Sequence, residues 1–255
     1  MNPMPTRKKD EFVVALSRGL AVIKAFGRDA AALSLTDVSK RTNLARATSR
    51  RLLFTLEALG YVRTDGRAFS LTPRVLELGY SYLASVPLAE LAQPVMKAVV
   101  EELGESCSLA VLDGDDIVYI ARIPPKHLMT IPVNVGSRLP ASVTSTGRVL
   151  LAALPTDTLE KYLSGVRIKR FTRFTVTARK LPSVLRNVAA QGYALTDQEL
   201  EEGLRALAVP VRSRTGTVVA SLNVSAHAMR ANKSEMIRNY LPVLRKAADR
   251  IGGLA

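Results

Sequence analysis

The chain has 255 residues, of which 47% are hydrophobic and 5% aromatic, and it carries 36 Lys and Arg against 22 Asp and Glu, a formal net charge of +14. This length and apolar content support about two domains with hydrophobic cores and exclude a disordered polypeptide. No apolar run approaches the length of a membrane span, and residues 1–10 lack the apolar core of a signal peptide, so we expect a cytoplasmic protein with no membrane partner.

Residues 34–59 predict two helices joined by a tight turn. Ser34 is a cap-type residue at the start of an apolar pattern, and Asn43 supplies the turn chemistry that ends the first helix. The buried face of the second helix is expected to consist of Leu52, Leu56 and Leu59. The residues on its other side, near its start, are Arg46, Ala47, Thr48, Arg50 and Arg51. A recognition helix presents such positions to the bases and phosphates of DNA.

The residues after this helix predict a basic hairpin. Gly60 ends the helix, and Asp65 and Gly66 are expected to form a two-residue turn between two short strands. Arg63 and Arg67 would then lie on the two arms of the hairpin. An arm of this kind commonly lies along DNA phosphates and does not read the sequence.

Basic residues are concentrated toward the N-terminus, since residues 1–75 hold 14 Lys or Arg and 6 Asp or Glu. Neutralisation of DNA phosphates explains this excess, although RNA or an anionic membrane surface would attract the same charge. For the arginines themselves, the alternative is the solvated face of an ordinary amphipathic helix. The helix-turn-helix, its arginines and the basic hairpin together favour double-stranded DNA. RNA is less favoured, because no aromatic cluster forms a stacking platform.

The sequence beyond the hairpin predicts a linker helix and a second domain. The linker helix occupies residues 76–86, and an amphipathic helix follows at residues 88–103. Two strands on either side of Gly114-Asp115 and a third extended segment at residues 128–135 predict an antiparallel meander. Cys107 lies in the first of these strands, where we interpret it as a buried small hydrophobic residue; a nucleophile or an effector contact is the alternative.

Hydroxyl residues crowd the start of a helix predicted at residues 144–152. Ser145, Thr146 and the following Gly147 would place hydroxyl groups and unpaired backbone N–H groups at its N-terminus. Such a helix start can bind an anionic group through hydrogen bonds and the helix dipole. Plain N-capping by the same hydroxyls is the alternative.

Two arginines flank this helix start, Arg138 and Arg148. Either guanidinium could pair with the carboxylate of an organic acid through two parallel hydrogen bonds. We favour Arg138, because it lies on an extended segment that could face a cavity, whereas the side chain of Arg148 could turn outward. The alternative is that the helix-start amides and Ser145 hold the carboxylate without a cation.

The C-terminal part predicts a hairpin with one polar face and a final helix. Residues 207–211 and 217–227 form the two strands of this hairpin. Strand alternation places three polar residues on one face, Ser221, Asn223 and Ser225. This face is in contact with solvent or lines a pocket. The final helix, residues 232–252, is expected to kink at Pro242.

Five segments resemble those of a known family in their order and spacing. They are LSRGLAVIKAF, SLTDVSKRTNLARATSRRLLFTLEALGYV, GSRLPASVTSTGRVLLA, GYALTDQELEEGLRALAVPV and SLNVSAH. Together they resemble IclR-type transcriptional regulators. Their sequences are most similar to those of the subgroup that regulates aromatic-acid catabolism through the β-ketoadipate route. The resemblance implies an α+β protein: a winged helix-turn-helix (10–75), a linker helix (76–86) and a GAF-like effector domain with a curved antiparallel sheet (87–255). It also implies a homodimer or a dimer of dimers on a palindromic operator.

The resemblance implies an effector-binding site at specific residues of this chain. The matching positions are Ser145, Thr146, Gly147, Thr196, Asp197, Asn223 and Ser225. Three residues depart from the family pattern. Thr146 stands where relatives usually have Met or Ala, and Ala45 stands where a Ser or Thr commonly caps the recognition helix. Ala206 replaces a cysteine that often contacts small oxo-acids, so an aromatic or dicarboxylic acid is expected in preference to an acid such as pyruvate.

We interpret the chain as a ligand-responsive transcriptional regulator that binds operator DNA and a small organic acid, and that is not an enzyme. The alternative is an enzyme of GAF-like or hydrolase type with a basic regulatory domain. Its nucleophile and base would have to come from Cys107, His127 and His227, which lie in unrelated sequence contexts. The same scarcity of ligands predicts no metal and no cofactor. A basic RNA-binding or architectural protein, the third class, would lack a polar pocket in residues 105–227.

Overall fold

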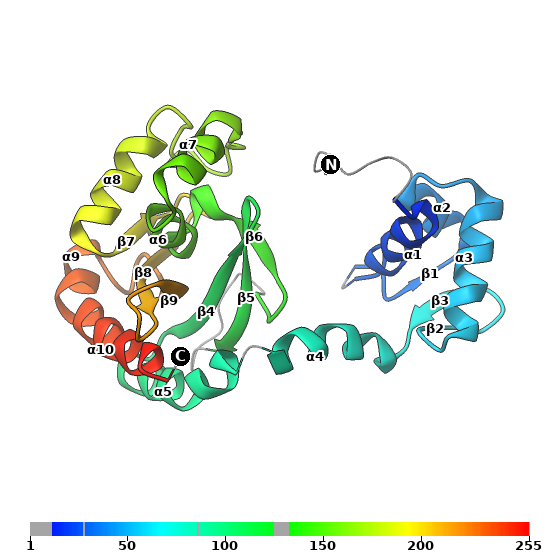
Figure 1. Cartoon of the computed structure of the whole chain (residues 1–255), viewed down its shortest axis with the longest axis horizontal. Helices are drawn as coiled ribbons and strands as arrows, with labels where there is room; N and C mark the ends of the chain where they lie inside the picture. The colour runs from blue at the N-terminus through cyan, green and yellow to red at the C-terminus, as the bar shows by residue number, and fades with distance from the viewer. Residues whose placement is uncertain (1–11, 28, 86, 125–132, 255) are drawn as a thin grey trace. The chain divides into compact units, whose positions relative to one another are not determined.

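The computed structural model describes residues 12–27, 29–85, 87–124 and 133–254, and the chain divides into two compact units, Met1–Tyr82 and Leu83–Ala255 (Figure 1). Each unit has its own hydrophobic core, built around residues such as Leu53 in the first and Leu222 in the second. Among the described residues, no helix is long and apolar enough to cross a membrane.

The first unit is a helix-turn-helix with a small antiparallel sheet. Its helices are α1 (Val14–Lys24), α2 (Leu35–Thr42) and α3 (Arg46–Ala58). Its strands are β1 (Ala32–Leu33), β2 (Val62–Thr64) and β3 (Phe69–Leu71), in the order β1-β3-β2. The hairpin β2-β3 follows α3 directly, so the predicted winged helix-turn-helix is confirmed.

Local signals fix the turn between α2 and α3. The Ser34 hydroxyl accepts a hydrogen bond from the backbone N–H of Asp37 at 3.2 Å, and the Asp37 carboxylate accepts one from the backbone N–H of Ser34. Asn43 ends α2 in the left-handed conformation (φ 53°), which asparagine tolerates better than most residues. Ala45 precedes α3 without a side-chain cap, so the departure noted in the sequence leaves the helix start uncapped.

The buried face of α3 is rotated from the one predicted. Leu53 and Leu56 are buried with Ser49, Leu52 is half-buried, and Leu59 is 52% exposed. Leu59 lies beyond the last helical residue, and the face centred on Leu53 packs into the core of the unit. The prediction that Leu59 belongs to the buried face is therefore wrong.

The loop of the hairpin is longer than predicted. Thr64 pairs with Phe69, so four residues and not two connect the strands. The Asp65 carboxylate accepts hydrogen bonds from the backbone N–H groups of Arg67 at 2.9 Å and Ala68 at 2.8 Å, which holds the loop in a tight turn. Arg67 thus lies in the loop and not on an arm, because the Asp65 side chain closes a wider turn than the Asp-Gly pair suggests.

The second unit is built on a six-stranded antiparallel sheet. Its strands are β4 (Ser106–Asp113), β5 (Asp116–Ile123), β6 (Arg138–Pro140), β7 (Ala194–Asp197), β8 (Leu204–Arg212) and β9 (Val218–His227). Their order is β6-β5-β4-β9-β8-β7. The helices are α4 (Leu76–Ser85), which spans the division between the units, α5 (Leu88–Leu103), α6 (Ser145–Ala152), α7 (Thr156–Gly165), α8 (Leu181–Gln191), α9 (Lys233–Glu235) and α10 (Leu241–Gly252).

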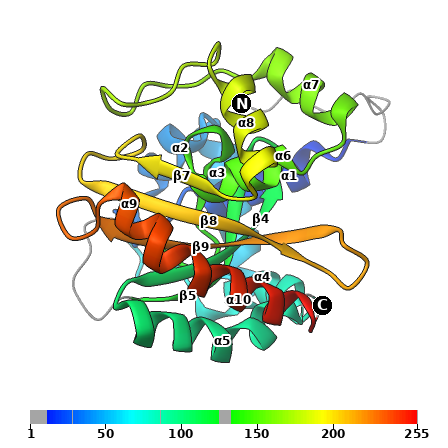
Figure 2. The same ribbon diagram turned by 90° about the vertical axis from the view of Figure 1, so that its left-hand side faces the viewer.

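Helices cover both faces of this sheet, as Figure 2 shows. On one face, α5 and α10 pack on the apolar side chains of β4, β8 and β9, including Leu109, Leu207 and Leu222. On the other face, α6 and α8 pack on Ala110 and Ile117, among others. The predicted curved antiparallel effector domain is confirmed. The polar face of β9 lies on the α6 side of the sheet.

Two details differ from the sequence predictions. The meander is present as β4-β5-β6, but its third strand is Arg138–Pro140; residues 128–132 of the extended segment predicted earlier lie outside the described residues, as does His127. Pro242 does not simply kink the final helix. The residues before it, Met236–Tyr240, form a π-helical turn, a rearrangement of the backbone hydrogen bonds close to a residue that has no N–H to donate.

Candidate functional site

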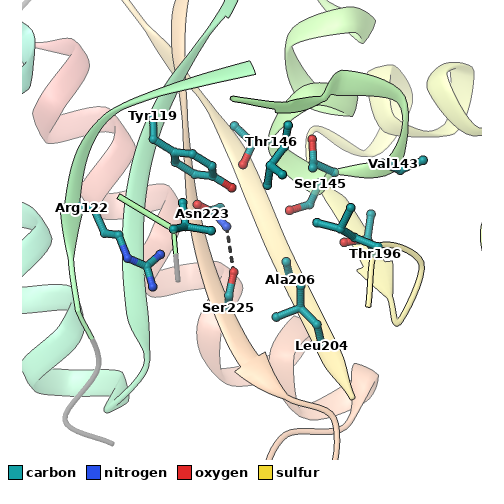
Figure 3. A pocket seen from close by; sticks show the side chains of 14 residues that line it. Tyr119, Arg122, Val143, Ser145, Thr146, Thr196, Leu204, Ala206, Asn223 and Ser225 are labelled. Carbon is teal, nitrogen blue, oxygen red and sulfur yellow. Dashed lines mark hydrogen bonds between the residues drawn. The ribbon is translucent and has the colours of Figure 1, made fainter. Parts of the chain in front are cut away.

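A cavity lies between the start of α6 and the polar face of the sheet (Figure 3). Its walls come from β5, β6, β7, β8 and β9, the start of α6 and the turn after β7. The space between these side chains measures about 470 Å³, counting its opening to solvent.

Five residues of the predicted effector site line this cavity together. They are Ser145, Thr146, Thr196, Asn223 and Ser225. They come from α6, β7 and β9, segments that are up to 80 residues apart in the sequence, and Figure 3 shows them around one space. The third polar residue of β9, Ser221, lies elsewhere, because its hydroxyl donates to the carbonyl of Val209 at 3.2 Å.

Three polar atoms in this cavity are buried without a hydrogen-bond partner among the described residues. They are Ser145 Oγ, Thr146 Oγ1 and Asn223 Oδ1. Their residues are 1%, 1% and 3% exposed. Asn223 Nδ2 donates to Ser225 Oγ at 3.1 Å, which orients the amide. Buried polar atoms in native proteins are nearly always hydrogen-bonded, so three orphaned atoms in one cavity indicate a place for polar groups of a bound molecule.

N-capping does not use these hydroxyls. The cap of α6 is Thr144, whose Oγ1 accepts a hydrogen bond from the backbone N–H of Gly147 at 3.1 Å. Gly147 itself does not line the cavity. A Cβ atom at this position would lie 2.2 Å from the carbonyl oxygen of Ala141, so glycine allows α6 to pack closely against the preceding turn.

A cation and a phenol at this cavity were missed by the sequence analysis: Arg122 and Tyr119, both on β5. The two are three positions apart, and simple strand alternation would put them on opposite faces. Between them β5 bulges, since Tyr119 pairs with Ala110 and Ala121 pairs with Leu109, leaving Ile120 as an extra residue. The bulge brings Tyr119 and Arg122 onto the cavity face.

The Arg122 guanidinium has no carboxylate partner within the described part of the chain. Its Nη1 donates to Ser108 Oγ at 3.2 Å. Burial lowers the pKa of Arg122, so its charged form would be stabilised by an anionic ligand. Burial also raises the pKa of Tyr119 to about 12, which keeps the hydroxyl protonated as a hydrogen-bond donor.

The structure places Arg138 away from this cavity. Its guanidinium donates to the carboxylates of Asp113 and Asp116, on the hairpin between β4 and β5, and 45% of its side chain is exposed. The hydrogen bond that Arg138 donates to Asp113, reinforced by the one to Asp116, raises the pKa of Arg138. The prediction that Arg138 faces the cavity is wrong, because two nearby carboxylates hold it at the surface.

Arg148 turns inward and not outward. Its Nη1 and Nη2 donate to the two carboxylate oxygens of Glu199 at 2.7 and 2.5 Å, and its Nε donates to the carbonyl of Ser142 at 2.9 Å. Both members of the pair are buried. Glu199 belongs to the turn after β7, and the next residue, Leu200, lines the cavity. The pair therefore fixes a wall of the cavity and leaves no charge for a ligand.

Asp197 is also outside the cavity lining. Its carboxylate pairs with Arg205 at 2.7 Å and with Lys233 at 2.8 Å. Burial raises the pKa of Asp197, but the hydrogen bonds from Lys233 and Arg205 outweigh burial, so the pKa lies below its ordinary value. The carboxylate links β7, β8 and α9.

Predicted DNA-contacting residues lie exposed on the first unit. Arg46, Ala47, Arg50 and Arg51 on α3 are exposed, as are Arg63 and Arg67 of the hairpin, whereas Thr48 is half-buried. None of these five arginines forms an ion pair within the described ranges. Arg50 lies over the ring of Phe54 at 5.1 Å, which limits the freedom of its side chain.

Catalytic and metal chemistry have little support in this geometry. Cys107 is fully buried, and burial raises the pKa of its thiol, which opposes formation of a thiolate nucleophile. His227 accepts a hydrogen bond at Nδ1 from the backbone N–H of Met229 at 3.3 Å. In the described residues, no group of three His, Cys, Asp or Glu is placed to hold a metal ion.

Comparisons with known proteins match both units. A model of the IclR helix-turn-helix domain matches residues 15–66, and a model of the C-terminal part of IclR-type bacterial transcriptional regulators matches residues 80–252. The chain is 45% identical over 240 residues to the Pca regulon regulatory protein of Pseudomonas putida, covering 93% of this chain and 82% of the relative.

Solved structures agree with these matches. A crystal structure of a Rhodococcus sp. RHA1 protein has a TM-score of 0.84 and 46% identity, and covers 94% of this chain and 97% of that one. An IclR homologue from Microbacterium hydrocarbonoxydans, crystallised in complex with 4-hydroxybenzoate, has a TM-score of 0.81 and 27% identity, with 93% and 97% covered.

Proposed function

Because the chain belongs to the IclR family of bacterial transcriptional regulators, we propose that it controls transcription in response to a hydroxybenzoate-type acid bound in the cavity of its second unit. The single observation that carries this proposal is the cavity itself: three orphaned buried polar atoms and a half-buried arginine without a carboxylate partner among the described residues. The 4-hydroxybenzoate held by the Microbacterium homologue supports the choice of ligand class.

Each part of such an acid has a matching group in the cavity. Arg122 is the residue we assign to the carboxylate, with Tyr119 beside it on β5. Ser145, Thr146 and Asn223 are assigned to the ring hydroxyl, because their oxygens have no other partner. Apolar side chains line the space between these groups, namely Val133, Leu139, Val143, Leu200 and Leu204. An aromatic ring would be buried among them.

A monocarboxylate fits this cavity better than a dicarboxylate. Among the described residues that line it, Arg122 is the one cation, since Arg138 and Arg148 are paired with carboxylates elsewhere. A second carboxylate would have only the neutral hydroxyls and the backbone N–H groups at the start of α6. We assign that end to a hydroxyl group.

A titration with 4-hydroxybenzoate tests the proposed function. The melting temperature of the purified chain should rise with ligand concentration, because a ligand that binds only the folded state stabilises it. Binding of the operator should change over the same concentration range. Adipate, a dicarboxylate without a ring, is the control and should stabilise the chain less. Absence of any thermal shift, or conversion of the acid into a product, would contradict the proposal.

For DNA we assign residues 10–75 as the binding domain, 76–86 as the linker and 87–255 as the effector domain. Arg46, Ala47, Thr48, Arg50 and Arg51 are assigned to the major groove and its phosphates, and Arg63 and Arg67 to the phosphates beside the hairpin. One recognition helix reads one half-site, so a palindromic operator requires two copies of the chain.

Exposed apolar residues support assembly of a homodimer, or of a dimer of dimers. Leu16 and Leu20 on α1 and Leu76 and Tyr80 on α4 are all exposed, and such side chains commonly mark protein interfaces. We propose that copies of the chain associate through these helices. A regulator of this kind acts where the chromosome is, so we propose a cytoplasmic location.

Arginine replacement on α3 is expected to weaken operator binding. Arg46→Ala and Arg50→Ala should each cost about 1–3 kcal/mol of binding free energy for a lost base contact. A fluorescence titration with operator DNA at physiological salt measures the loss. Arg250→Ala, which removes an exposed arginine from α10 in the second unit, is the matched control and should bind as the parent does. Equal affinity of all three variants would reject α3 as the recognition helix.

A further inference from the structure

A long basic loop connects α7 to α8, and nothing in the function described so far uses it. Residues 166–180, here called the basic loop, contain no regular helix or strand and no acidic residue. Its six cations are Arg167, Lys169, Arg170, Arg173, Arg179 and Lys180. Irregular connections of this length are uncommon inside compact domains and are usually functional or disordered.

Hydrogen bonds anchor the middle of this loop to the turn after β7. Thr172 Oγ1 donates to the carbonyl of Gln198 at 2.7 Å, and Thr175 Oγ1 donates to the carbonyl of Glu199 at 2.8 Å. The backbone N–H of Val176 donates to the Glu199 carboxylate at 3.1 Å. Glu199 is itself paired with Arg148, so the anchor is part of a buried network. Anchoring the backbone in advance lowers the entropy cost of binding a partner.

All six cations of the loop are exposed and nearly unpaired. Among the described residues, the one carboxylate that pairs with any of these six cations is Glu202, which lies 3.8 Å from Arg173, and both side chains are mostly exposed. Arg170, Arg173 and Lys180 line one groove beside the loop. Figure 2 shows the loop on the side of the sheet covered by α6 and α8, away from α5 and α10. The result is a concentrated positive surface.

Two exposed phenylalanines orient these charges. Lys169 Nζ lies over the ring of Phe171 at 5.7 Å, and the Arg173 guanidinium lies over the ring of Phe174 at 4.8 Å. One face of each ring is therefore covered by a cation, which leaves less aromatic surface for stacking on the bases of a single-stranded nucleic acid. Cations held over the rings in this way suit a row of phosphates.

We propose that the basic loop binds the phosphate backbone of duplex DNA that flanks the operator. Duplex DNA is the polyanion that the proposed function already requires this chain to bind, and its phosphates match the charge of the loop. Phosphate contacts do not depend on base sequence, so the loop adds affinity without altering operator choice. The proposal rests on DNA binding by the first unit and goes beyond the assigned effector site.

Two duplexes test this assignment with the full chain: an operator core selected in vitro, and the same core extended on both sides by arbitrary sequence. The parent should bind the extended duplex more tightly, with a plot of log affinity against log salt steeper by about 0.9 per added phosphate contact. Arg167→Gln, Lys169→Gln, Arg173→Gln and Arg179→Gln combined should abolish this gain and leave core binding unchanged.

The matched control removes four exposed cations that lie outside the basic loop, on helical segments of the second unit. Its substitutions are Lys97→Gln, Arg238→Gln, Lys246→Gln and Arg250→Gln. It has the same net charge as the loop variant and should keep the gain. If the loop variant fails to fold, two double variants, Arg167→Gln with Lys169→Gln and Arg173→Gln with Arg179→Gln, should each lose part of the gain.

Two results would overturn the proposal: a parent that binds both duplexes equally, and a loop variant that keeps the full gain. In the second case, loss of poly-L-glutamate binding by the loop variant would assign the loop to an acidic protein. Failure of the first unit to bind DNA would appear instead as loss of binding to the core duplex.

Discussion

Glu199→Gln is expected to lower the free energy of unfolding by about 3–5 kcal/mol, the cost of leaving one member of a buried ion pair without its partner. Arg148 and Glu199 are both buried and hydrogen-bonded to each other. The Glu199 carboxylate also accepts a hydrogen bond from the backbone N–H of Val176. Without the negative charge, the Arg148 guanidinium stays desolvated beside a neutral amide. Denaturant unfolding of the parent and the variant measures the difference.

Two further variants test whether the loss of stability comes from the unpaired buried charge. Arg148→Met combined with Glu199→Leu should recover most of the loss, because removing both buried charges also removes the desolvation penalty. Glu202→Gln breaks the exposed pair with Arg173 and should change stability by less than about 1 kcal/mol. A Glu199→Gln protein as stable as the parent would show that the pair is hydrated in solution.

Arg122→Gln is expected to reduce the affinity for 4-hydroxybenzoate about ten- to a hundredfold, because a charge-assisted hydrogen bond contributes roughly 1.5–3 kcal/mol. The variant should fold normally, since Arg122 is half-buried and has Ser108 as its one hydrogen-bond partner within the described ranges. Calorimetric titration measures the dissociation constant directly.

Arg138→Gln is the matched control for this measurement, since Arg138 is on the neighbouring strand β6 but pairs with Asp113 and Asp116. Its dissociation constant should equal that of the parent. Phenol, which lacks the carboxylate, should bind the parent and Arg122→Gln equally weakly. An unchanged affinity of Arg122→Gln for 4-hydroxybenzoate would reject Arg122 as the carboxylate partner. The carboxylate would then be assigned to the N–H groups at the start of α6.

The parts of the fold that were predictable are governed by local signals. The cap residue Ser34 begins α2 and the left-handed Asn43 ends it, both through contacts within a few residues. The β4-β5 hairpin follows from its Gly114-Asp115 turn. The α7 helix was not predicted, because it buries none of its own residues and so has a weak apolar pattern.

The missed and misplaced site residues depend on contacts distant in the sequence. Arg148 turns inward because of Glu199, which lies 51 residues later. Arg138 stays at the surface because the β5-β6 pairing brings it to two carboxylates. Arg122 reaches the cavity because of a bulge at Ile120 that alternation of polar and apolar residues does not reveal. By contrast, Asn223 and Ser225 were found, since β9 has a regular alternation on that face.

At the start of α6, different residues maintain the fold and line the cavity, and this separation affects how the protein can evolve. Thr144 caps the helix, and Gly147 allows its close packing on Ala141, so the fold depends on these two positions. Ser145 and Thr146, which lie between them, make no side-chain hydrogen bond to the rest of the described chain. Under the proposed function, mutations at positions 145 and 146 would change which molecule is recognised while the scaffold persists, so a duplicated gene would acquire a new effector in a few steps.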